Sequence, residues 1–381
     1  MQRLLLALGL SKVLLALCFS SAQANVLVVD ETGAAGTDHT TLQSAIDAAA
    51  DGDLILIRPG HYQGTIDGKS LVLQGETADS AWISLLTIEN LAANQVAVVR
   101  DCKGDRTPSV VRNCAGTVRI EGGSYYGLDC SNAADVVLRG VTLRAYTSLT
   151  YDCLGGLDLV DSVVYVYYSI IYGEEGSIMG MGLPYCEPGP GISMKDSTAY
   201  LQGSFVTGGD ECSSFNCLVT VCPASGVIAS GTSSLELVDT GVKAGKRTTC
   251  AATPVYVGIT PTIRPGNARR ISSPSPVLEG QGSHLSFYGD PGDFVYLAMT
   301  QDAALARYYA IAGVYHGRLA STVLQAAGTI PASGVLRQTF QVPAFTGPDL
   351  MTPFYLQGFF VRPGEKLLGA PTQVYVLDPS Y

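Results

Sequence analysis

One pair of acidic residues has a spacing that could support chemistry. Asp129-Cys130 and Asp152-Cys153 are the same dipeptide, repeated after 23 residues. If the chain forms coils of about that length, the two carboxylates lie side by side. Adjacent carboxylates can bind Ca²⁺ through oxygen ligands, or raise one carboxyl pKa for acid–base catalysis. We favour the structural alternative, in which both aspartates cap turns and a Cys130–Cys153 disulfide staples two coils.

Aromatic and acidic residues elsewhere could bind a ligand without catalysis. Tyrosines are frequent between residues 151 and 172, and aromatic rings can stack on the apolar faces of sugars. Acidic pairs lie in two longer gaps, and solenoid proteins often place binding functions on such insertions. The candidate ligand-binding residues are Tyr151, Tyr168, Tyr172, Glu174, Glu175, Asp210 and Glu211. The ordinary alternatives are tyrosines that face the core and acidic residues that are merely solvated.

Residues 1–24 have the order of a secretory signal peptide. Arg3 precedes an apolar run from Leu4 to Phe19, and Ala22-Gln23-Ala24 supplies small residues for cleavage. A lipoprotein signal ending at Cys18 fits less well, and the apolar run is shorter than the ~20 residues of a membrane anchor. We therefore expect a secreted or cell-surface protein whose mature chain has no transmembrane segment.

The cysteines fit the same location. Nine remain after cleavage, all before residue 251, and cysteines of secreted proteins are more often disulfide partners than metal ligands. We expect a Cys130–Cys153 disulfide and further disulfides that use Cys102 and Cys114. The odd number leaves at least one cysteine unpaired or bonded to another chain. No motif requires a cofactor, although Ca²⁺ would suit the paired carboxylates.

The net charge of −10 argues against one class of partner. An acidic surface repels phosphate backbones, so we expect no nucleic acid. The four histidines have no serine or cysteine partner in a recognisable context, which leaves a nucleophilic triad unsupported.

A five-residue pattern recurs in the first two thirds of the chain: apolar, any, apolar, any, then Gly or Asp. Copies begin at Leu71, Val96, Val118, Val136, Leu157, Ile192 and Leu235. Most steps are about twenty residues, which predicts a solenoid of stacked coils. The two longer gaps predict an inserted loop after Tyr172 and a hidden coil near Cys217. We expect Asp161, Asp196 and Asp239, which end three copies, to form turns. The alternative is an antiparallel sandwich, which does not predict one signature at near-constant phase.

The start of the mature chain resembles a known family. Thr40–Ala50 has the pattern of a short amphipathic helix, and Asp51-Gly52-Asp53, the apolar Leu54–Ile57 and Arg58-Pro59-Gly60-His61-Tyr62 follow it. This order is similar to the opening of the pectin-lyase-like superfamily, in which the helix covers the raw end of the solenoid. The resemblance implies an all-β fold, a right-handed parallel β-helix over residues 25–262. It implies nothing about activity.

The C-terminal part differs in composition. Residues 263–276 have the Pro, Arg, Ser and Gly content of a linker. Short apolar stretches separated by turns then predict a small β-sandwich over residues 277–381. The run from Gly334-Val335-Leu336 through Tyr355-Leu356-Gln357-Gly358-Phe359 resembles C-terminal modules of uncharacterised secreted bacterial proteins.

Enzymes of the pectin-lyase-like superfamily carry sequence strings that this chain lacks. Those of pectinesterases, polygalacturonases and the commonest pectate lyases are absent, apart from the fragments Gly60-His61-Tyr62 and Arg58-Pro59. We therefore expect a non-catalytic binding, adhesion or structural module that contacts glycans or surface material. The alternative is a polysaccharide lyase or hydrolase of unrecognised family that acts on acidic polysaccharide. Its candidate catalytic residues are Asp129, Asp152, Arg144 and Lys195.

Overall fold

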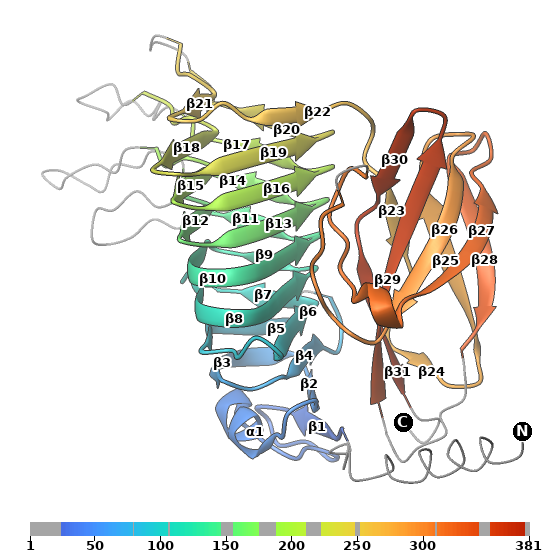
Figure 1. The fold of residues 1–381 in the computed structure, drawn as a ribbon. Coiled ribbons are helices and arrows are strands. Elements are labelled where there is room, and N and C mark those ends of the chain that lie inside the picture. The colour runs from blue at the N-terminus through green and yellow to red at the C-terminus, as the bar shows by residue number, and fades with distance from the viewer. Residues whose placement is uncertain are drawn as a thin grey trace, which may run out of the picture.

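The computed structural model describes residues 24–78, 80–105, 107–145, 155–174, 188–210, 222–247, 252–308, 311–342 and 351–377. Over these residues the chain is an all-β protein in two parts, as the sequence predicts. A solenoid of stacked parallel coils runs from β1 to β22, and a sandwich from β23 to β31 lies along one flank of it (Figure 1). In the described part of the chain, no helix is long and apolar enough to cross a bilayer.

The solenoid consists of a 17-stranded sheet and a 5-stranded sheet, both parallel. The 17 strands are β1 (Val26–Val29), β2 (Leu54–Ile57), β3 (Gly60–Asp67), β4 (Val72–Gly75), β5 (Ala81–Glu89), β6 (Val96–Arg100), β7 (Cys102–Gly104), β8 (Ser109–Glu121), β10 (Leu128–Arg139), β12 (Leu157–Val160), β13 (Val163–Tyr167), β15 (Ile192–Lys195), β16 (Thr198–Gln202), β18 (Val227–Ser230), β19 (Ser234–Val238), β21 (Tyr256–Val257) and β22 (Thr262–Arg264). The five strands are β9 (Ser124–Tyr125), β11 (Thr142–Arg144), β14 (Ile170–Tyr172), β17 (Phe205–Thr207) and β20 (Gly241–Lys243).

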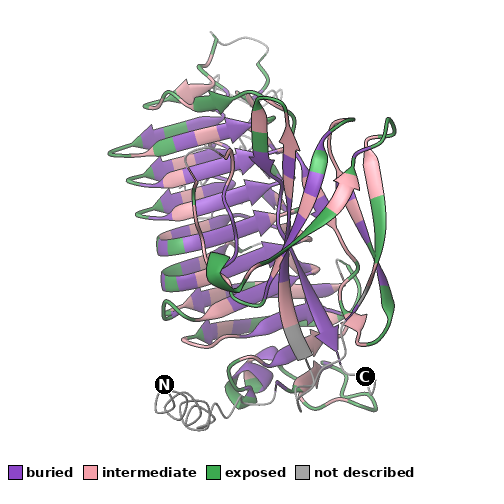
Figure 2. Cartoon of the chain, turned by 45° about the vertical axis from the view of Figure 1, so that its right-hand side comes forward, coloured by how far each residue is buried: buried purple, intermediate pink, exposed green. Residues whose placement is uncertain are grey.

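Apolar residues of successive coils stack in register and form the solenoid core. One inward row runs through Ile55, Leu73, Val99, Ile120, Leu138, Val166, Leu201 and Leu237. Every member of this row is at most 2% exposed, so each strand buries its apolar face against the coils above and below. Buried residues are found in the stacked coils and in the sandwich strands beside them (Figure 2), whereas β21 and β22 of the last coil have none.

The structure corrects the predicted phase of the repeat. Val136 pairs with Val164 on β13, whereas Leu157 pairs with Leu128 on β10, so the recurring pattern mixes two different strands of the coil. The hidden coil predicted near Cys217 is also wrong. β15 pairs directly with β18, and β16 pairs directly with β19, which leaves no place for another coil between them. The longer spacing instead belongs to the connection between β17 and β18.

The predicted turns and end cap are confirmed. Asp161, Asp196 and Asp239 have φ of 48°, 50° and 45°, a left-handed conformation that Asp tolerates better than most residues. At the N-terminal end, α1 (Leu42–Ala48) buries Leu42, Ala45 and Ile46 against the first coils, and Thr41 caps it by accepting the Ser44 N–H.

The sandwich packs a 3-stranded sheet on a 6-stranded sheet. The first contains β23 (Arg270–Ser272), β25 (Gly282–Tyr288) and β28 (Val335–Gln341), and the second contains β24 (Val277–Leu278), β26 (Phe294–Thr300), β27 (Val323–Thr329), β29 (Met351–Arg362), β30 (Glu365–Leu368) and β31 (Thr372–Leu377), with a short 3₁₀ helix η1 (Leu319–Ser321) before β27. Phe287 of one sheet and Phe360 of the other meet in a shared apolar core. The expected linker is shorter than 263–276, because β22 still pairs with the solenoid and β23 already pairs with β25.

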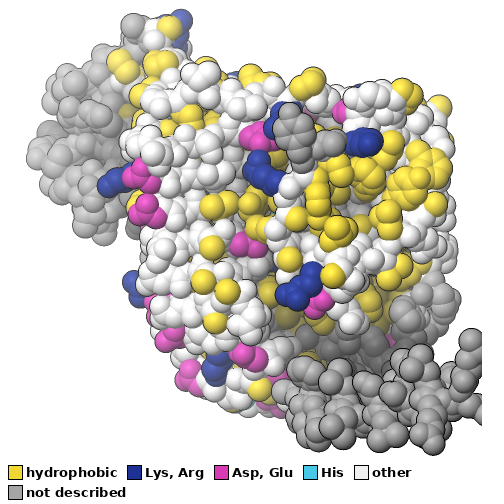
Figure 3. All heavy atoms as spheres, in the orientation of Figure 1, with side chains coloured by type: hydrophobic (Ala, Val, Ile, Leu, Met, Phe, Trp, Pro, Cys, Tyr) yellow, Lys and Arg dark blue, Asp and Glu magenta, His cyan; other side chains and the backbone are white. Residues whose placement is uncertain are grey.

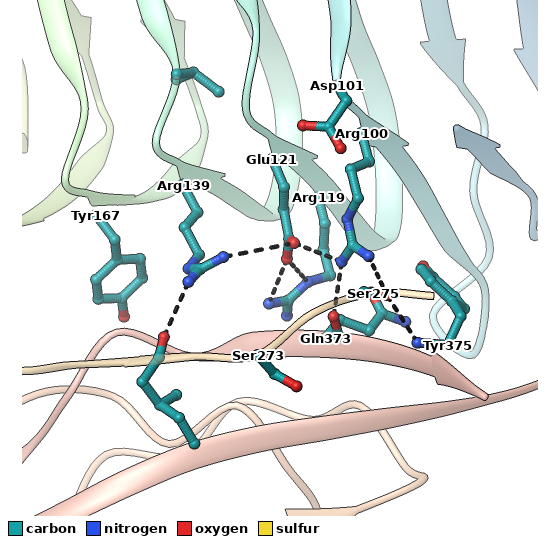
Figure 4. Close-up of polar contacts among 12 residues, drawn as sticks. Arg100, Asp101, Arg119, Glu121, Arg139, Tyr167, Ser273, Ser275, Gln373 and Tyr375 are labelled. Atoms are coloured by element: carbon teal, nitrogen blue, oxygen red, sulfur yellow. Dashed lines mark hydrogen bonds and ion pairs between the residues drawn. The ribbon is translucent and has the colours of Figure 1, made fainter. Parts of the chain in front are cut away.

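Buried charges join the two parts (Figure 4). The Glu121 carboxylate lies 2.6 Å from Arg100, 3.3 Å from Arg119 and 4.0 Å from Arg139. Although burial opposes ionisation, these guanidinium groups lower the pKa of Glu121 to about 2. Arg100 also donates to Ser275 Oγ and to the Gln373 carbonyl, so solenoid and sandwich share one hydrogen-bonded cluster.

Tyrosines form the apolar part of the same junction. Tyr165, Tyr167 and Tyr200 lie beside one another on β13 and β16 and pack against His316 or Val314 of the sandwich. The Tyr167 hydroxyl lies 2.8 Å from His316 Nε2. Burial keeps the pKa of His316 well below its usual value, so this imidazole is neutral at physiological pH. These tyrosines therefore serve domain docking, not sugar binding.

Replacement of Glu121 by Gln tests the charge cluster. We expect E121Q to lower the free energy of unfolding by about 3–5 kcal/mol, because it leaves buried guanidinium groups without a counter-charge. The matched control is E89Q, which breaks the exposed Arg112–Glu89 pair and should cost no more than about 1 kcal/mol. Urea denaturation measures both, and equal costs would contradict the account.

Replacement of Asp135 by Asn tests a second buried acid. Burial raises the Asp135 pKa to about 6, so the folded state holds its proton more tightly than the unfolded state. The residue therefore destabilises the fold above pH 6, and this cost disappears as the pH falls toward 4. We expect D135N to stabilise the protein by about 1–3 kcal/mol near pH 8 and by much less near pH 4.5. Urea denaturation at both pH values measures the free energy of unfolding. Equal stabilisation by D135N at pH 8 and at pH 4.5 would contradict this account.

Candidate functional site

The outer face of the 5-stranded sheet carries cationic and aromatic side chains. Sequence spacing alone could not show that these side chains are neighbours. Alternate residues of its strands point inward, and Leu143, Ile171 and Val206 are buried. The remaining positions face outward in rows. One row is Arg144, Tyr172, Thr207 and Lys243, which are partners on successive strands.

Cations lie over rings on this face. The Arg144 guanidinium is 4.4 Å from the centre of the Tyr172 ring, and the Lys243 ammonium is 5.3 Å from the centre of the Phe205 ring. Each contact is a cation–π interaction, which holds the charge beside an aromatic surface without neutralising it.

A groove of about 530 Å³ lies over these pairs. Four candidates from the sequence line it together: Arg144, Tyr172, Glu174 and Asp210. The groove needs glycine at its base, because a Cβ on Gly209 would lie 1.5 Å from the Glu174 carbonyl oxygen. Asp210 is held by the Lys246 backbone N–H, which donates to its Oδ1 at 2.7 Å.

The same kind of contact continues on earlier coils. His61 of β3, Trp82 of β5 and Lys103 of β7 are partners in register. The Lys103 ammonium lies 4.0 Å from the Trp82 ring centre, and the His61 ring stacks on Trp82 at 5.6 Å. Because β7 contacts β9, both groups belong to one continuous surface. We define the cation–aromatic face as His61, Trp82, Lys103, Arg144, Tyr172, Phe205 and Lys243.

A pair of stacked carboxylates lies on a different surface, the outer side of β10 and β12. Asp129 pairs in register with Asp158 on the next coil. The predicted neighbour, Asp152, lies outside the described residues. Burial, and then the charge of Asp129, raise the pKa of Asp158 to about 6, and burial also raises the pKa of Asp129. The Gly155 N–H donates to Asp158 at 3.0 Å.

Other candidates are dispersed. Lys195 is exposed and pairs with Val160, two positions along from Asp158. Tyr168 lies at the junction with the sandwich, 5.2 Å below the Arg270 guanidinium. Tyr151, Cys153, Glu175 and Glu211 lie outside the described residues. Among the residues that are described, no three Asp, Glu, His or Cys side chains cluster as metal ligands would.

The predicted disulfides at three positions are wrong. Cys102, Cys114 and Cys130 carry free, buried thiols, and burial raises the pKa of Cys102 to about 12. Their side chains point into the solenoid core, where a thiol packs as a small apolar group. Cys130 therefore cannot form the expected bond to Cys153. Cys222, for which no specific pairing was expected, is disulfide-bonded.

The front of the molecule offers a contrasting surface. Hydrophobic side chains gather over the sandwich in this view (Figure 3), and the exposed large apolar residues of the sandwich are Phe294, Leu319, Val323 and Leu324. The described cation–ring pairs with a groove over them lie on the 5-stranded sheet, so the cation–aromatic face is the stronger candidate for recognition of a polar ligand.

Comparison with known proteins adds no family to this geometry. The chain matches no protein-family model and no curated protein. The chemistry of the cation–aromatic face is therefore the basis on which its function can be proposed.

Proposed function

We propose that the protein is a secreted or cell-surface module that binds acidic polysaccharide along the cation–aromatic face. Aromatic rings stack on the apolar C–H faces of sugars. Lysine and arginine beside those rings pair with carboxylate or sulfate groups. A β-helix repeats such positions every ~4.8 Å, which suits an extended polymer better than a small compact ligand.

The observation that supports this most is the repetition of one contact type along one face. Lys103 on Trp82, Arg144 on Tyr172 and Lys243 on Phe205 are three cation–π pairs on strands of the same surface. None of these three cations forms an ion pair with a carboxylate of the described residues. In the groove lining the three cations Arg144, Lys243 and Lys246 outnumber the two acids Glu174 and Asp210, which favours an anionic ligand at this place.

Replacement of Tyr172 or Lys243 tests this function. We expect Y172A to weaken binding of a uronate-containing or sulfated polysaccharide by about three- to tenfold, because it removes one stacking surface. K243Q should weaken binding and reduce its dependence on salt, since exposed charges are screened at high ionic strength. Isothermal titration with polygalacturonate, after a screen on a glycan array, measures both effects.

The matched control is F294A, which removes an exposed ring of the sandwich and should leave affinity unchanged. Neutral glucans provide the control ligand. Equal affinity for neutral and acidic polymers, or no retained glycan on the array, would rule out the proposed function.

The stacked carboxylates favour a second candidate function, that of a polysaccharide lyase or hydrolase. A carboxyl group with a pKa of about 6 can gain and lose a proton near neutral pH, as a general acid or base requires. Asp158 has this property, and Asp129 beside it carries a second raised pKa. The pair is therefore the place where we would expect proton transfer.

Titration and activity of Asp158 variants test the second candidate. We expect D129N to lower the pKa of Asp158, because it removes a neighbouring like charge, and carbon NMR of the carboxyl groups measures the shift. If the pair is catalytic, D158N should abolish product formation from acidic polysaccharide, and the exposed D47N should not. A panel on which wild-type protein releases neither unsaturated products nor reducing ends would exclude the enzyme.

A further inference from the structure

A second polar cavity lies between the solenoid and the sandwich, away from the cation–aromatic face. Its volume is about 300 Å³. The residues that give it its chemistry are Arg100, Glu121, Arg139, Arg270, Ser273 and Ser275. Figure 4 shows that Arg100, Arg119 and Arg139 converge on the single carboxylate of Glu121 at this place.

Positive charge exceeds negative charge around the cavity. Arg100 binds Glu121 tightly at 2.6 Å, whereas the Arg139 guanidinium lies 4.0 Å from Glu121 and donates a hydrogen bond to the Ile271 carbonyl. The other carboxylate on the cavity wall is Asp101, which accepts from the Gln74 amide at 3.2 Å. Three guanidinium groups, those of Arg100, Arg139 and Arg270, thus face two carboxylates, those of Asp101 and Glu121. Burial, and then neighbouring arginines including Arg270, lower the pKa of Arg139, as expected where cations crowd.

Arg270 is the least neutralised of these cations. Its guanidinium lies 4.3 Å from the Tyr288 ring centre and 5.2 Å from that of Tyr168. It forms no ion pair with a carboxylate of the described residues. Two aromatic faces hold the guanidinium plane but leave its N–H donors without an anionic acceptor.

Hydroxyl groups on the same wall can add to recognition. Ser275 Oγ accepts hydrogen bonds from Arg100 and from the Tyr375 N–H. Its own proton is therefore left to donate. Such a set of guanidinium and hydroxyl donors matches the oxygens of phosphate, sulfate or carboxylate.

We propose that this interdomain cavity binds a small ligand through one oxyanion group, held between Arg139 of β10 and Arg270 of β23. The cavity volume is at the lower end of small-molecule sites, which are about 300–1,000 Å³. It accommodates an acidic monosaccharide as well as an inorganic anion. Because one arginine belongs to the solenoid and the other to the sandwich, the bound group neutralises both parts at once and strengthens their docking.

Titration of the full-length mature protein tests the proposal. Sulfate, phosphate, galacturonate and neutral galactose are added separately, with chloride used to hold ionic strength constant. We expect sulfate, phosphate or galacturonate to raise Tm by about 2–4 °C near saturation, with a matching calorimetric isotherm, and galactose to have no effect. A rise with galacturonate alone identifies an acidic sugar as the ligand source, and a rise with all three identifies any small oxyanion. No rise beyond that of chloride overturns the proposal.

Variants locate the site. R270Q should reduce affinity for the responding anion at least tenfold, and R270K should reduce it less, because it keeps the charge but loses the fork geometry. The control R112Q removes an exposed arginine that pairs with Glu89 on the solenoid and should bind the anion normally. Unchanged affinity in R270K and R270Q would overturn the assignment. Y172A should bind the anion normally, because Tyr172 lies on the cation–aromatic face. Failure of anion binding in the interdomain cavity is therefore distinguishable from failure of polysaccharide binding.

Discussion

Register between stacked coils is the constraint on which the rest of this structure depends. A parallel strand places each side chain directly over its partner on the next coil, so any residue type that recurs becomes a row. Inside the solenoid this produces the apolar row from Ile55 to Leu237. Outside it produces the rows of the cation–aromatic face and brings Asp129 beside Asp158. Core and candidate sites are thus consequences of the same geometry.

The junction between solenoid and sandwich does not depend on the register of the coils but on a solenoid face that the sandwich covers. Solenoid faces usually end in water, yet here the face that carries Tyr165, Tyr167 and Tyr200 is covered by the sandwich. The same contact buries Arg100, Arg119 and Arg139, and Glu121 is their shared counter-ion. The cost of removing these charges from water is offset by hydrogen bonds to sandwich carbonyls, which fixes the orientation of the two parts more specifically than apolar contact alone.

The fold was largely predictable from sequence, and the arrangement of its sites was not. Alternation and turn residues predict coils, but Val136–Leu138 and Leu157–Leu159 have the same pattern while they occupy different strands, so spacing alone could not give the phase. Tyr172 and Arg144 were identified separately and for different roles. Phe205 and Lys243 were missed, because only the strand register shows that they lie beside Tyr172 and Arg144. Buried thiols were likewise mistaken for disulfides, since sequence does not tell which way a cysteine points.

The contacts of the sandwich have a consequence for how the protein unfolds. A solenoid is nearly one-dimensional, so its end coils can fray without disturbing the middle. Here residues of separate coils each bond to the sandwich: Arg100, Arg139, Tyr167, Gln202 and Glu236. The sandwich therefore holds five coils of the stack together. Losing one coil therefore strains its neighbours through the sandwich, which converts a chain of local openings into a single cooperative event.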